Sequence, residues 1–356
     1  MNVAQPTTGG AAVVVRHLVE RGLAAGMDLT VVCPDEGPLG PDVAAIGATW
    51  IPLAMRRAPG PWDVLAAWRL RPLLAAADVV HLHSSKAGAV GRVAVRRRGS
   101  GPGVAYTPHG WGWLVGGPLA PVYRGVERVL AGRADAIVAV SEADRVEGAG
   151  VLGRRRDRLQ VIPNAVDTDH FTPEGPVADR TDAPLVVCVG RLSFEKGQDV
   201  AIDALARMTT PDARLRLVGD GPARADLLDR AGRLGVADRL ELAGHTDPSP
   251  HLRAADVVTV PSRWDAQSLC LLEAMAAGKS VVATAVTGSD ALGDGGTVVP
   301  SEDPDALAAA LDELLGDRGR RRTMGVAGRR TVLESHRLEQ ATSATMDLWR
   351  SLAPSR

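Results

Sequence analysis

The feature that most constrains the fold is the alternation of short apolar runs with helix-like stretches along the whole chain. The runs are rich in Val, Leu and Ala and are bounded by Gly or Pro, which is typical of fully buried strands. The strand-like runs cover residues 29–34, 78–83, 103–109, 135–141, 158–164, 185–190, 214–221, 240–245, 257–262, 280–286 and 296–300. Between them, as at 63–77 and 120–132, apolar residues recur three and four positions apart. This alternation predicts an α/β fold with parallel sheets and right-handed crossovers.

A polar gap divides the alternation into two halves. Residues 165–184 hold three prolines and interrupt the pattern, as a linker would. A length of 356 residues also suits two domains better than one. We therefore expect two doubly wound, Rossmann-like domains facing a cleft, with the ligand at the carboxyl ends of strands. The expected bounds are an N-terminal domain at 1–170, a linker at 171–184, a C-terminal domain at 185–335, and a helix at 336–356 that packs back on the N-terminal domain.

The charges do not select a macromolecular partner. Lys and Arg number 41 against 42 Asp and Glu, so no overall field favours nucleic acid, and membrane contact is expected to be peripheral at most. Two tight basic clusters, Arg96–Arg98 and Arg154–Arg156, lie in the first half. They are either solvated surface charge or a contact for anionic lipid head groups or a phosphate-bearing acceptor.

Three cysteines bear on the compartment. Cys33, Cys188 and Cys270 lie inside apolar runs without paired spacing, so we expect buried thiols in a reducing compartment, and neither disulfides nor a metal site. No apolar stretch approaches about 20 residues, and the N-terminus lacks the pattern of a signal peptide. The expected location is cytoplasmic, with the inner face of the membrane as a further option.

The first candidate site is the glycine pair Gly9–Gly10, between a short strand-like segment and an apolar helix. Glycine allows close approach of a phosphate or sugar, and the helix N-terminus supplies partial positive charge. A structural tight turn explains the pair equally well, and the spacing does not form GxGxxG, which disfavours a nicotinamide cofactor. The first strand is short, either because Met1 is a late start or because the strand is clipped.

The second candidate is "VGRLSFEKGQD", 189–199, directly after the first strand of the second half. Arg191, through its fork, and Lys196, as a point charge, could neutralise the charge that a nucleoside diphosphate develops on leaving. Either residue alone would more often be a surface cation, but the pair at a strand's carboxyl end favours phosphate binding.

The third candidate is "PSRWDAQSLCLLEAMAAGKSVVAT", 261–284. Asp265 falls in a loop, and a helix is predicted from about Ser268, so the amides near Gln267, Ser268 and Leu269 suit a phosphate. Glu273 lies on this helix and could accept both hydroxyls of a ribose. The alternative for Glu273 is a solvated or ion-paired acid, although its apolar neighbours imply that the carboxylate needs a partner.

The fourth candidate is "YTPHGWGW", 106–113, where a strand ends in a loop of the first half. His109 could hydrogen-bond a sugar or stabilise a developing cation, and Trp111 and Trp113 could offer ring faces to a sugar or an apolar acceptor. A lone histidine is more often structural. A weaker candidate for the acceptor is the earlier strand end with His83, Ser84 and Lys86.

Taken in order, these segments resemble the retaining, nucleotide-sugar-dependent glycosyltransferases of the GT-B fold, in glycosyltransferase family 4. The motifs that carry the resemblance are "TTGG", "TPHG", "VSEADR", "VIPNAVD", "VGRLSFEKG", "LVGDGP", "GHTD", "AADVVTVPS", "LLEAMAAG" and "GDGGTVVP". The resemblance implies a nucleotide-sugar donor bound by the C-terminal domain, a hydroxyl acceptor on the N-terminal side, no other cofactor and no metal.

The resemblance also implies roles for the candidates. Arg191 and Lys196 would grip the diphosphate, Glu273 would take the ribose, and Gly9 and Gly10 would close over the phosphate. Transfer with retention would follow when the diphosphate leaves and its oxygen helps to deprotonate the acceptor hydroxyl. His109 and Asp265 would orient the donor sugar.

The chain departs from the family pattern around the donor sugar. The family's paired acids are spaced E-x7-E, and here the first is Asp265; Ala266 stands where Gly is common and Ser280 where Pro is common. The segment 286–296 is one residue short. These departures keep open a non-catalytic partner protein of the same fold, and the shared architecture keeps open a sugar-nucleotide epimerase or a phosphorylase. The acceptor is a lipid-linked sugar of surface polysaccharide, inositol phosphate, or a small natural product.

Overall fold

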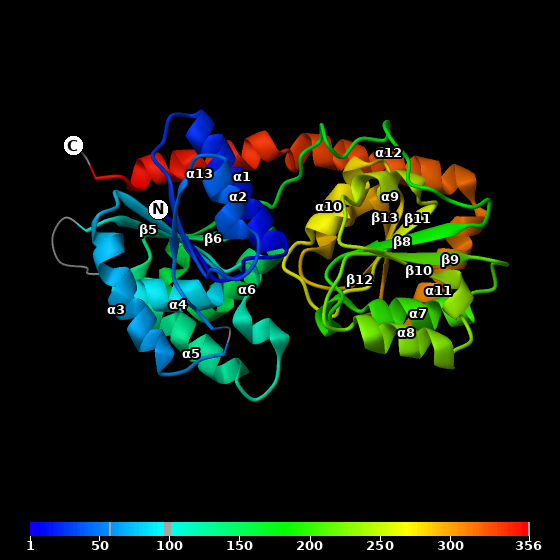
Figure 1. Ribbon diagram of the computed structural model, residues 1–356, viewed down its shortest axis with the longest axis horizontal. Helices are drawn as coiled ribbons and strands as arrows, with labels where there is room; N and C mark the ends of the chain where they lie inside the picture. Colours follow the sequence, from blue (N-terminus) through cyan, green and yellow to red (C-terminus); the bar gives the residue numbers. More distant parts are fainter. Residues whose placement is uncertain (57, 96–100, 355–356) are drawn as a thin grey trace. The chain divides into compact units, whose positions relative to one another are not determined.

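The computed structural model describes residues 1–56, 58–95 and 101–354. The chain forms two compact units (Figure 1). Unit 1 comprises residues 1–164 and 339–356, and unit 2 comprises 165–338. The residues expected to form a linker, 171–184, belong to unit 2.

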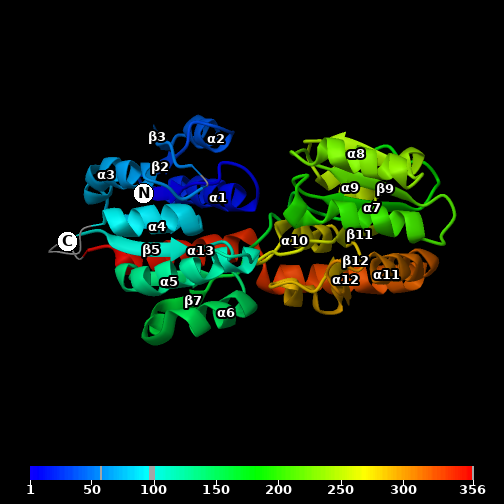
Figure 2. The same ribbon diagram turned by 90° about the horizontal axis from the view of Figure 1, so that it is seen from below.

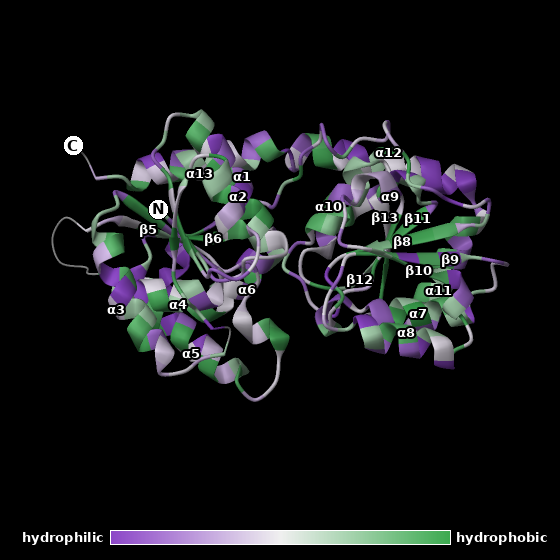
Figure 3. Cartoon of the chain, in the orientation of Figure 1, coloured by the Kyte–Doolittle hydropathy of each residue, from purple (hydrophilic) through white to green (hydrophobic). Residues whose placement is uncertain are grey.

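In its described residues, unit 1 contains a seven-stranded parallel sheet with the order β3-β2-β1-β4-β5-β6-β7. Its strands are β1 (Asn2–Ala4), β2 (Thr30–Cys33), β3 (Thr49–Pro52), β4 (Val79–His83), β5 (Gly103–Thr107), β6 (Ala136–Ala139) and β7 (Leu159–Val161). The inner strands are buried on both faces, and they show as apolar ribbons (Figure 3). That burial is the reason why they read as continuous apolar runs in the sequence.

Helices cover both faces of the unit 1 sheet. They are α1 (Gly10–Ala24), α2 (Leu39–Ala45), α3 (Trp62–Ala75), α4 (Ser84–Ala94), α5 (Ala120–Leu130), α6 (Glu142–Leu152) and α13 (Leu338–Leu352), with short 3-10 helices at Gly112–Val115, Ala131–Arg133 and Gly153–Arg158. One core packs α1, α2 and Trp349 of α13 against the sheet, and another packs α3 and α4 against its opposite face.

In its described residues, unit 2 repeats the plan with a six-stranded parallel sheet in the order β10-β9-β8-β11-β12-β13. Its strands are β8 (Leu185–Val189), β9 (Arg214–Val218), β10 (Leu240–Gly244), β11 (Val257–Val260), β12 (Val281–Thr284) and β13 (Gly296–Val299). Its helices are α7 (Gln198–Arg207), α8 (Arg224–Arg233), α9 (Ser249–Ala254), α10 (Leu269–Ala276), α11 (Pro304–Gly316) and α12 (Arg318–Ser335), with 3-10 helices at Phe194–Lys196, Ala237–Arg239 and Ser289–Gly295. Figure 1 shows helices α7 and α8 on one side of this sheet and α12 on the other, and Figure 2 shows the unit from the α7–α8 side.

Each sheet reverses its strand order once, between β1 and β4 in unit 1 and between β8 and β11 in unit 2. Ligands of doubly wound sheets bind outside the carboxyl ends of the strands at such a reversal. The predicted α/β class with two parallel sheets is confirmed.

The edge strand β3 differs from the sequence expectation, whereas the first strand is short, as expected. β3 (Thr49–Pro52) was not predicted, because it is a short edge strand with half-exposed and exposed residues and no apolar run. β1 (Asn2–Ala4) is short but central, since it pairs with both β2 and β4. Its three residues are all buried, so packing rather than length keeps it in the sheet.

The last helix belongs to unit 1. Trp349 of α13 is buried and donates a hydrogen bond from Nε1 to Nδ1 of His81 on β4 at 3.0 Å. The unit boundary falls between 338 and 339, at the first turn of α13, a few residues after the expected 335.

Candidate functional site

The loop after β8 has a backbone shape that only glycine allows at one point. Gly197, with φ of 66°, is the N-cap residue directly before α7, and a Cβ there would lie 2.0 Å from the carbonyl oxygen of Pro261. Gln198 Nε2 donates to the carbonyl of Arg191 at 2.9 Å and so holds the start of the same loop. The loop after β8 is thereby fixed against the loop after β11, across the strand-order reversal.

This packing brings two of the predicted site residues together. Lys196 Nζ donates to Asp265 Oδ2 at 2.6 Å, with the side chains 25% and 19% exposed. Burial alone would lower the pKa of Lys196, but the charges of Asp265, Cys270 and Glu195 outweigh it and raise the pKa. Asp265 Oδ1 accepts from its neighbour's amide, Ala266 N, at 3.1 Å. Lys196 is therefore a cation at any ordinary pH, held at a partly open position by a carboxylate.

The short side chain of Asp265 reaches both Lys196 and the amide of Ala266. We expect Asp265→Glu to lower kcat, because a side chain one methylene longer cannot keep both the Lys196 and the Ala266 hydrogen bonds on the same backbone. Steady-state transfer rates with a saturating donor would measure this. An increase in kcat would instead mean that the shorter acid is a handicap.

Arg191 has a different partner. Its guanidinium pairs with Glu195, and its side chain is 42% exposed. Burial raises the pKa of Glu195, but hydrogen bonds to its own backbone amide, Arg191 and Ser193 lower it overall. The structure therefore places Arg191 near the loop's outer edge, paired within the loop rather than with Lys196 or Asp265.

The N-terminus of α10 faces a second tightly packed loop. Gly288, with φ of 83°, could not carry a Cβ, which would lie 1.8 Å from the carbonyl oxygen of Ala266. Ser268 is the N-cap residue, but no side chain caps the helix, and its own Oγ is buried without a partner in the described structure. The first-turn amides of α10, beginning at Leu269, are thus available to an anion. Gln267, which precedes Ser268, is 5% exposed.

Glu273 lies one turn further along α10. No ion pair or side-chain hydrogen bond joins it to the described residues, so the partner expected from its apolar surroundings is not a protein group there. Burial raises the pKa of Glu273 to about 7, the charge of Asp247 adds to the shift, and Lys196 opposes it. A half-buried acid without a protein partner among the described residues suits a ligand that brings hydroxyl donors.

The Glu273 pKa predicts a pH dependence of donor binding. A carboxylate can accept from two ribose hydroxyls, whereas the protonated acid has lost part of that capacity. Protonation of Glu273 as the pH falls through about 7 should therefore weaken donor binding. Calorimetry with a nucleotide sugar, whose diphosphate does not titrate near neutrality, would measure it between pH 5.5 and 8.5. Glu273→Gln should bind more weakly and lose the dependence, and an equal dependence in that variant would contradict the role.

Among the site residues predicted in unit 1, His83, His109, Gly9 and Gly10 lie at strand or helix ends, whereas Lys86 is held in an ion pair. His109 follows β5 and lies against His83 at the end of β4, with His83 Nδ1 3.1 Å from His109 Nε2. Gly9, with φ of 77°, precedes α1, and Gly9 and Gly10 are exposed, with no side chain capping that helix. Lys86, in contrast, is held by Asp63 at 2.7 Å and by the carbonyl of Ala58 at 3.1 Å, as an ordinary structural cation.

The structure corrects the expectation for the tryptophans. Trp111 is 1% exposed and its indole donates to the carbonyl of Asp144 at 2.8 Å. Trp113 is 3% exposed, stacks on Trp111 at 4.7 Å, and donates to Glu147 at 2.6 Å. Both rings belong to the core, because burying an indole with its N–H bonded is more favourable than leaving it in the loop's solvent. Trp111 therefore offers no ring face to an acceptor.

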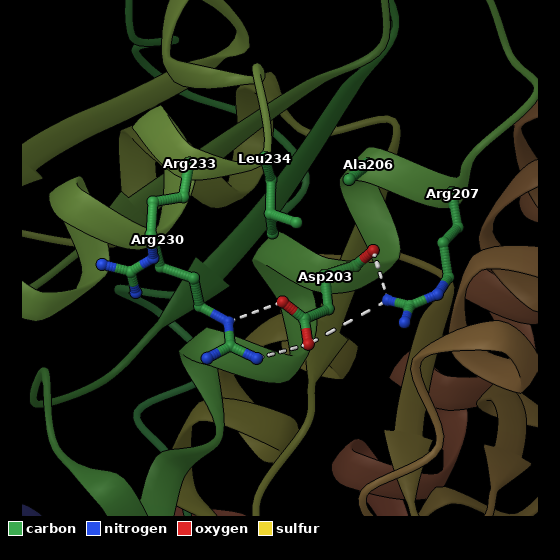
Figure 4. A pocket seen from close by; sticks show the side chains of 6 residues that line it. All are labelled: Asp203, Ala206, Arg207, Arg230, Arg233 and Leu234. Atoms are coloured by element: carbon green, nitrogen blue, oxygen red, sulfur yellow. Dashed lines mark hydrogen bonds and ion pairs between the residues drawn. The ribbon is translucent and has the colours of Figure 1, made fainter.

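A hollow on the α7–α8 surface is not part of this arrangement. It is lined by Asp203, Ala206, Arg207, Arg230, Arg233 and Leu234 (Figure 4). Arg230 and Arg207 both point to Asp203, which Arg230 contacts at 2.5 Å and 2.6 Å (Figure 4). The carboxylate offsets part of the positive charge, and none of the predicted site residues lines this hollow.

The remaining expectations concern the two arginine clusters, the cysteines, a metal site and membrane-spanning helices. Arg154–Arg156 are exposed in the 3-10 helix Gly153–Arg158, whereas Arg96–Arg98 lie outside the described residues. The cysteines are free thiols, and burial raises the pKa of Cys33 to about 11 and that of Cys188 to about 12. Across residues 1–56, 58–95 and 101–354, no group of three or more His, Cys, Asp or Glu is arranged to hold a metal. No helix in those ranges is both long and apolar enough to cross a bilayer.

Comparison with known proteins defines the family. Residues 8–170 match the model of glycosyltransferase family 4, and residues 183–317 match that of glycosyl transferases group 1. Two relatives are a GDP-mannose-dependent alpha-(1-6)-phosphatidylinositol monomannoside mannosyltransferase of Mycolicibacterium smegmatis, 36% identical over 63% of this chain and 64% of that protein, and a D-inositol 3-phosphate glycosyltransferase of Xylanimonas cellulosilytica, 32% identical over 76% and 71%.

A solved structure agrees on the fold. The Anabaena protein Alr3699/HepE, crystallised with UDP, superposes with a TM-score of 0.82 over 99% of both chains at 20% identity. The chain belongs to glycosyltransferase family 4, and the prediction of the GT-B fold is confirmed. It is accordingly a glycosyltransferase, and the expected class of donor, a nucleotide sugar, follows with the family.

Proposed function

We propose that this chain is a retaining hexosyltransferase that moves mannose from GDP-mannose to a hydroxyl of a phosphoinositol-bearing acceptor. The observation that carries the proposal is the group at the carboxyl ends of β8 and β11. There the Lys196–Asp265 pair lies with the uncapped N-terminus of α10 and with Glu273, which has no partner among the described residues. The relatives' names supply the donor and the acceptor, because one uses GDP-mannose and both act on inositol phosphates or their lipids.

The donor's parts match these groups one by one. The two phosphates would lie at Lys196 and Arg191 and at the amides of the N-cap residue Ser268 and of the first turn of α10, beginning at Leu269. Glu273 would accept from the ribose hydroxyls. Asp265, one oxygen of which stays on Lys196, would orient the hexose together with His109. Gly9 and Gly10 would leave room for the phosphate at the N-terminus of α1.

The chemical step follows from this placement. The bond between the sugar's anomeric carbon and the diphosphate oxygen breaks, and its electron pair goes to the diphosphate. The acceptor hydroxyl attacks the same face and passes its proton to that oxygen, so the configuration is retained. Lys196 and Arg191 stabilise the charge that develops on the leaving group, and such stabilisation by preorganised charges is usually the largest single contribution to catalysis.

A lipid-bound acceptor is favoured by the surface of α3 and α5, which flank α4 (Figure 1). Both helices expose apolar side chains, among them Val129 at 77%, Val64 at 74% and Trp68 at 70%, together with exposed arginines. Apolar and cationic side chains on one face fit an anionic bilayer surface. We therefore propose that the enzyme works at the inner face of the membrane. Inositol phosphate in solution and a lipid-linked sugar of surface polysaccharide are the alternative acceptors.

Ligand-induced thermal stabilisation tests the donor first. A ligand that binds the folded state at 100 times its Kd stabilises by about 2.7 kcal/mol, which is readily seen as a rise in Tm. We expect GDP-mannose to give the largest rise among common nucleotide sugars, and labelled mannose to pass to phosphatidylinositol or inositol phosphate. Stabilisation without transfer to any acceptor would favour the non-catalytic alternative, and free epimerised nucleotide sugar would indicate an epimerase.

A further inference from the structure

Three histidine rings lie together in unit 1. His81 and His83 lie on the same face of β4, with ring centroids 4.1 Å apart, and His109 stacks on His83 at 5.3 Å with a 22° interplanar angle. Burial lowers the pKa of all three, to about 3 for His81 and about 4 for His109. Each ring is therefore neutral at pH 7 and carries a single N–H, so its hydrogen bonds depend on which nitrogen holds the proton.

A chain of hydrogen bonds decides this for His109. The carboxamide oxygen of Asn2, on β1, lies 3.0 Å from His83 Nε2, and Asn2 and His83 are both buried. An amide oxygen only accepts hydrogen bonds, so the proton of His83 is on Nε2. The Nδ1 of His83 is then unprotonated and can only accept. His109 Nε2, 3.1 Å from that Nδ1, must then donate. The Nδ1 of His109 is left without a proton.

The backbone holds His109 at this place. Its φ is 52°, in the left-handed region that non-glycine residues rarely adopt, and Ser84, directly after His83, has φ of 81°. Such conformations persist where the surrounding structure determines them and concentrate at functional sites. His109 is half-buried at the carboxyl end of β5, whereas Asn2 and His83 lie in the interior.

We propose that Asn2 and His83 are positioning residues that hold His109 in its Nε2–H tautomer, so that the unprotonated Nδ1 can accept a hydrogen bond from a sugar hydroxyl. This rests on the proposed function, in which His109 contacts the donor sugar. With the other tautomer, Nδ1 would present an N–H and could not accept. Asn2 lies on the first strand, 81 residues from His83.

The neighbouring histidine offers a matched control. His81 accepts from Trp349 Nε1 at 3.0 Å, so it carries its proton on Nε2 and donates to Thr107 Oγ1 at 2.8 Å. This second chain of hydrogen bonds ends at Thr107 and does not include His109. Trp349→Phe removes a buried hydrogen bond of similar length from the same histidine group, but should leave the tautomer of His109 unchanged.

The tautomer can be read directly by NMR on the full chain labelled with ¹⁵N-histidine. Long-range ¹H–¹⁵N correlations distinguish the protonated from the unprotonated ring nitrogen, and the signals absent from His109→Gln identify His109. We expect Nε2–H in the wild type, in Asn2→Asp, which keeps an accepting oxygen, and in Trp349→Phe. Asn2→Leu should show a mixture of tautomers and a kcat lower by about tenfold at unchanged donor affinity.

Several results would overturn the proposal. An Nδ1–H His109 in the wild type would do so without any variant, as would an unchanged tautomer in Asn2→Leu. If Asn2→Leu does not fold, His83→Phe offers the same comparison. A changed tautomer with unchanged kcat would refute the positioning role. The expected tautomer in a protein that transfers no sugar from any donor would contradict the proposed function alone.

Discussion

Lys196→Ala is expected to lower kcat by about 10² or more while the protein stays folded. The ammonium lies 2.6 Å from Asp265 at a partly open position, and its raised pKa keeps it charged. A diphosphate leaving group gains negative charge as its bond to the sugar breaks, so a cation fixed beside it stabilises the transition state more than the ground state. The loss should appear mainly in kcat, measured with saturating donor and acceptor.

Two comparisons make this result specific. Arg207→Ala removes a cation of the same unit from the α7–α8 hollow, where its partners are Asp203 and Asp305, and should leave kcat unchanged. Lys196→Arg keeps the charge but not the compact shape, and should fall between the wild type and the alanine variant. Transfer by Lys196→Ala at the wild-type rate would refute the assignment of Lys196 to the leaving group.

Glu127→Ala is expected to destabilise unit 1 by about 3–5 kcal/mol, the usual cost of leaving a buried charge without its partner. Arg92 is fully buried, and its Nη2 donates to both Glu127 oxygens at 3.0 Å and 2.8 Å. Tyr106 donates to the same carboxylate at 2.8 Å, and the guanidinium lies 4.0 Å from the Tyr106 ring. Without the carboxylate, Arg92 and Tyr106 lose a hydrogen-bond acceptor in a site that water does not reach.

Urea unfolding followed by circular dichroism would measure the loss. The double variant Arg92→Met with Glu127→Leu should recover part of the stability, because an apolar pair of similar volume carries no buried charge, although the Tyr106 hydroxyl still loses its bond to Glu127. Glu142→Ala breaks the exposed Glu142–Arg145 pair of α6 and should leave the midpoint within error. A midpoint for Glu127→Ala as close to the wild type as that of Glu142→Ala would mean that Arg92 finds another partner.

Local sequence determines the strands of both sheets because burial on two faces requires continuous apolar residues. The runs at 78–83 and 185–190 coincide with β4 and β8 almost residue for residue. The same reasoning misses β3 (Thr49–Pro52), since an edge strand needs apolar residues on one face at most. The family resemblance allows the enzyme class to be predicted from the sequence as well, because the family's motifs occur in order along both halves.

The contacts of the site residues could not be predicted from the local sequence. Trp111 and Trp113 lie in a loop that looks suited to a sugar, but Asp144 and Glu147 of α6 accept from their indoles and keep them in the core. Lys86 looks available and is paired with Asp63. The Asn2–His83–His109 chain was missed, although a polar residue in an apolar strand such as Asn2 is the signal that could have indicated it.

The sequence by itself determined the α/β class, the division into two similar halves and the family, because each depends on patterns that repeat or recur within short stretches. Only the tertiary structure decided which polar groups meet. Asp265 joins Lys196 across 69 residues, and Glu273 is left without a partner in the described structure. The physical reason is that a hydrogen bond or an ion pair requires contact within about 3 Å. Such contact depends on how strands and loops pack rather than on their spacing along the chain.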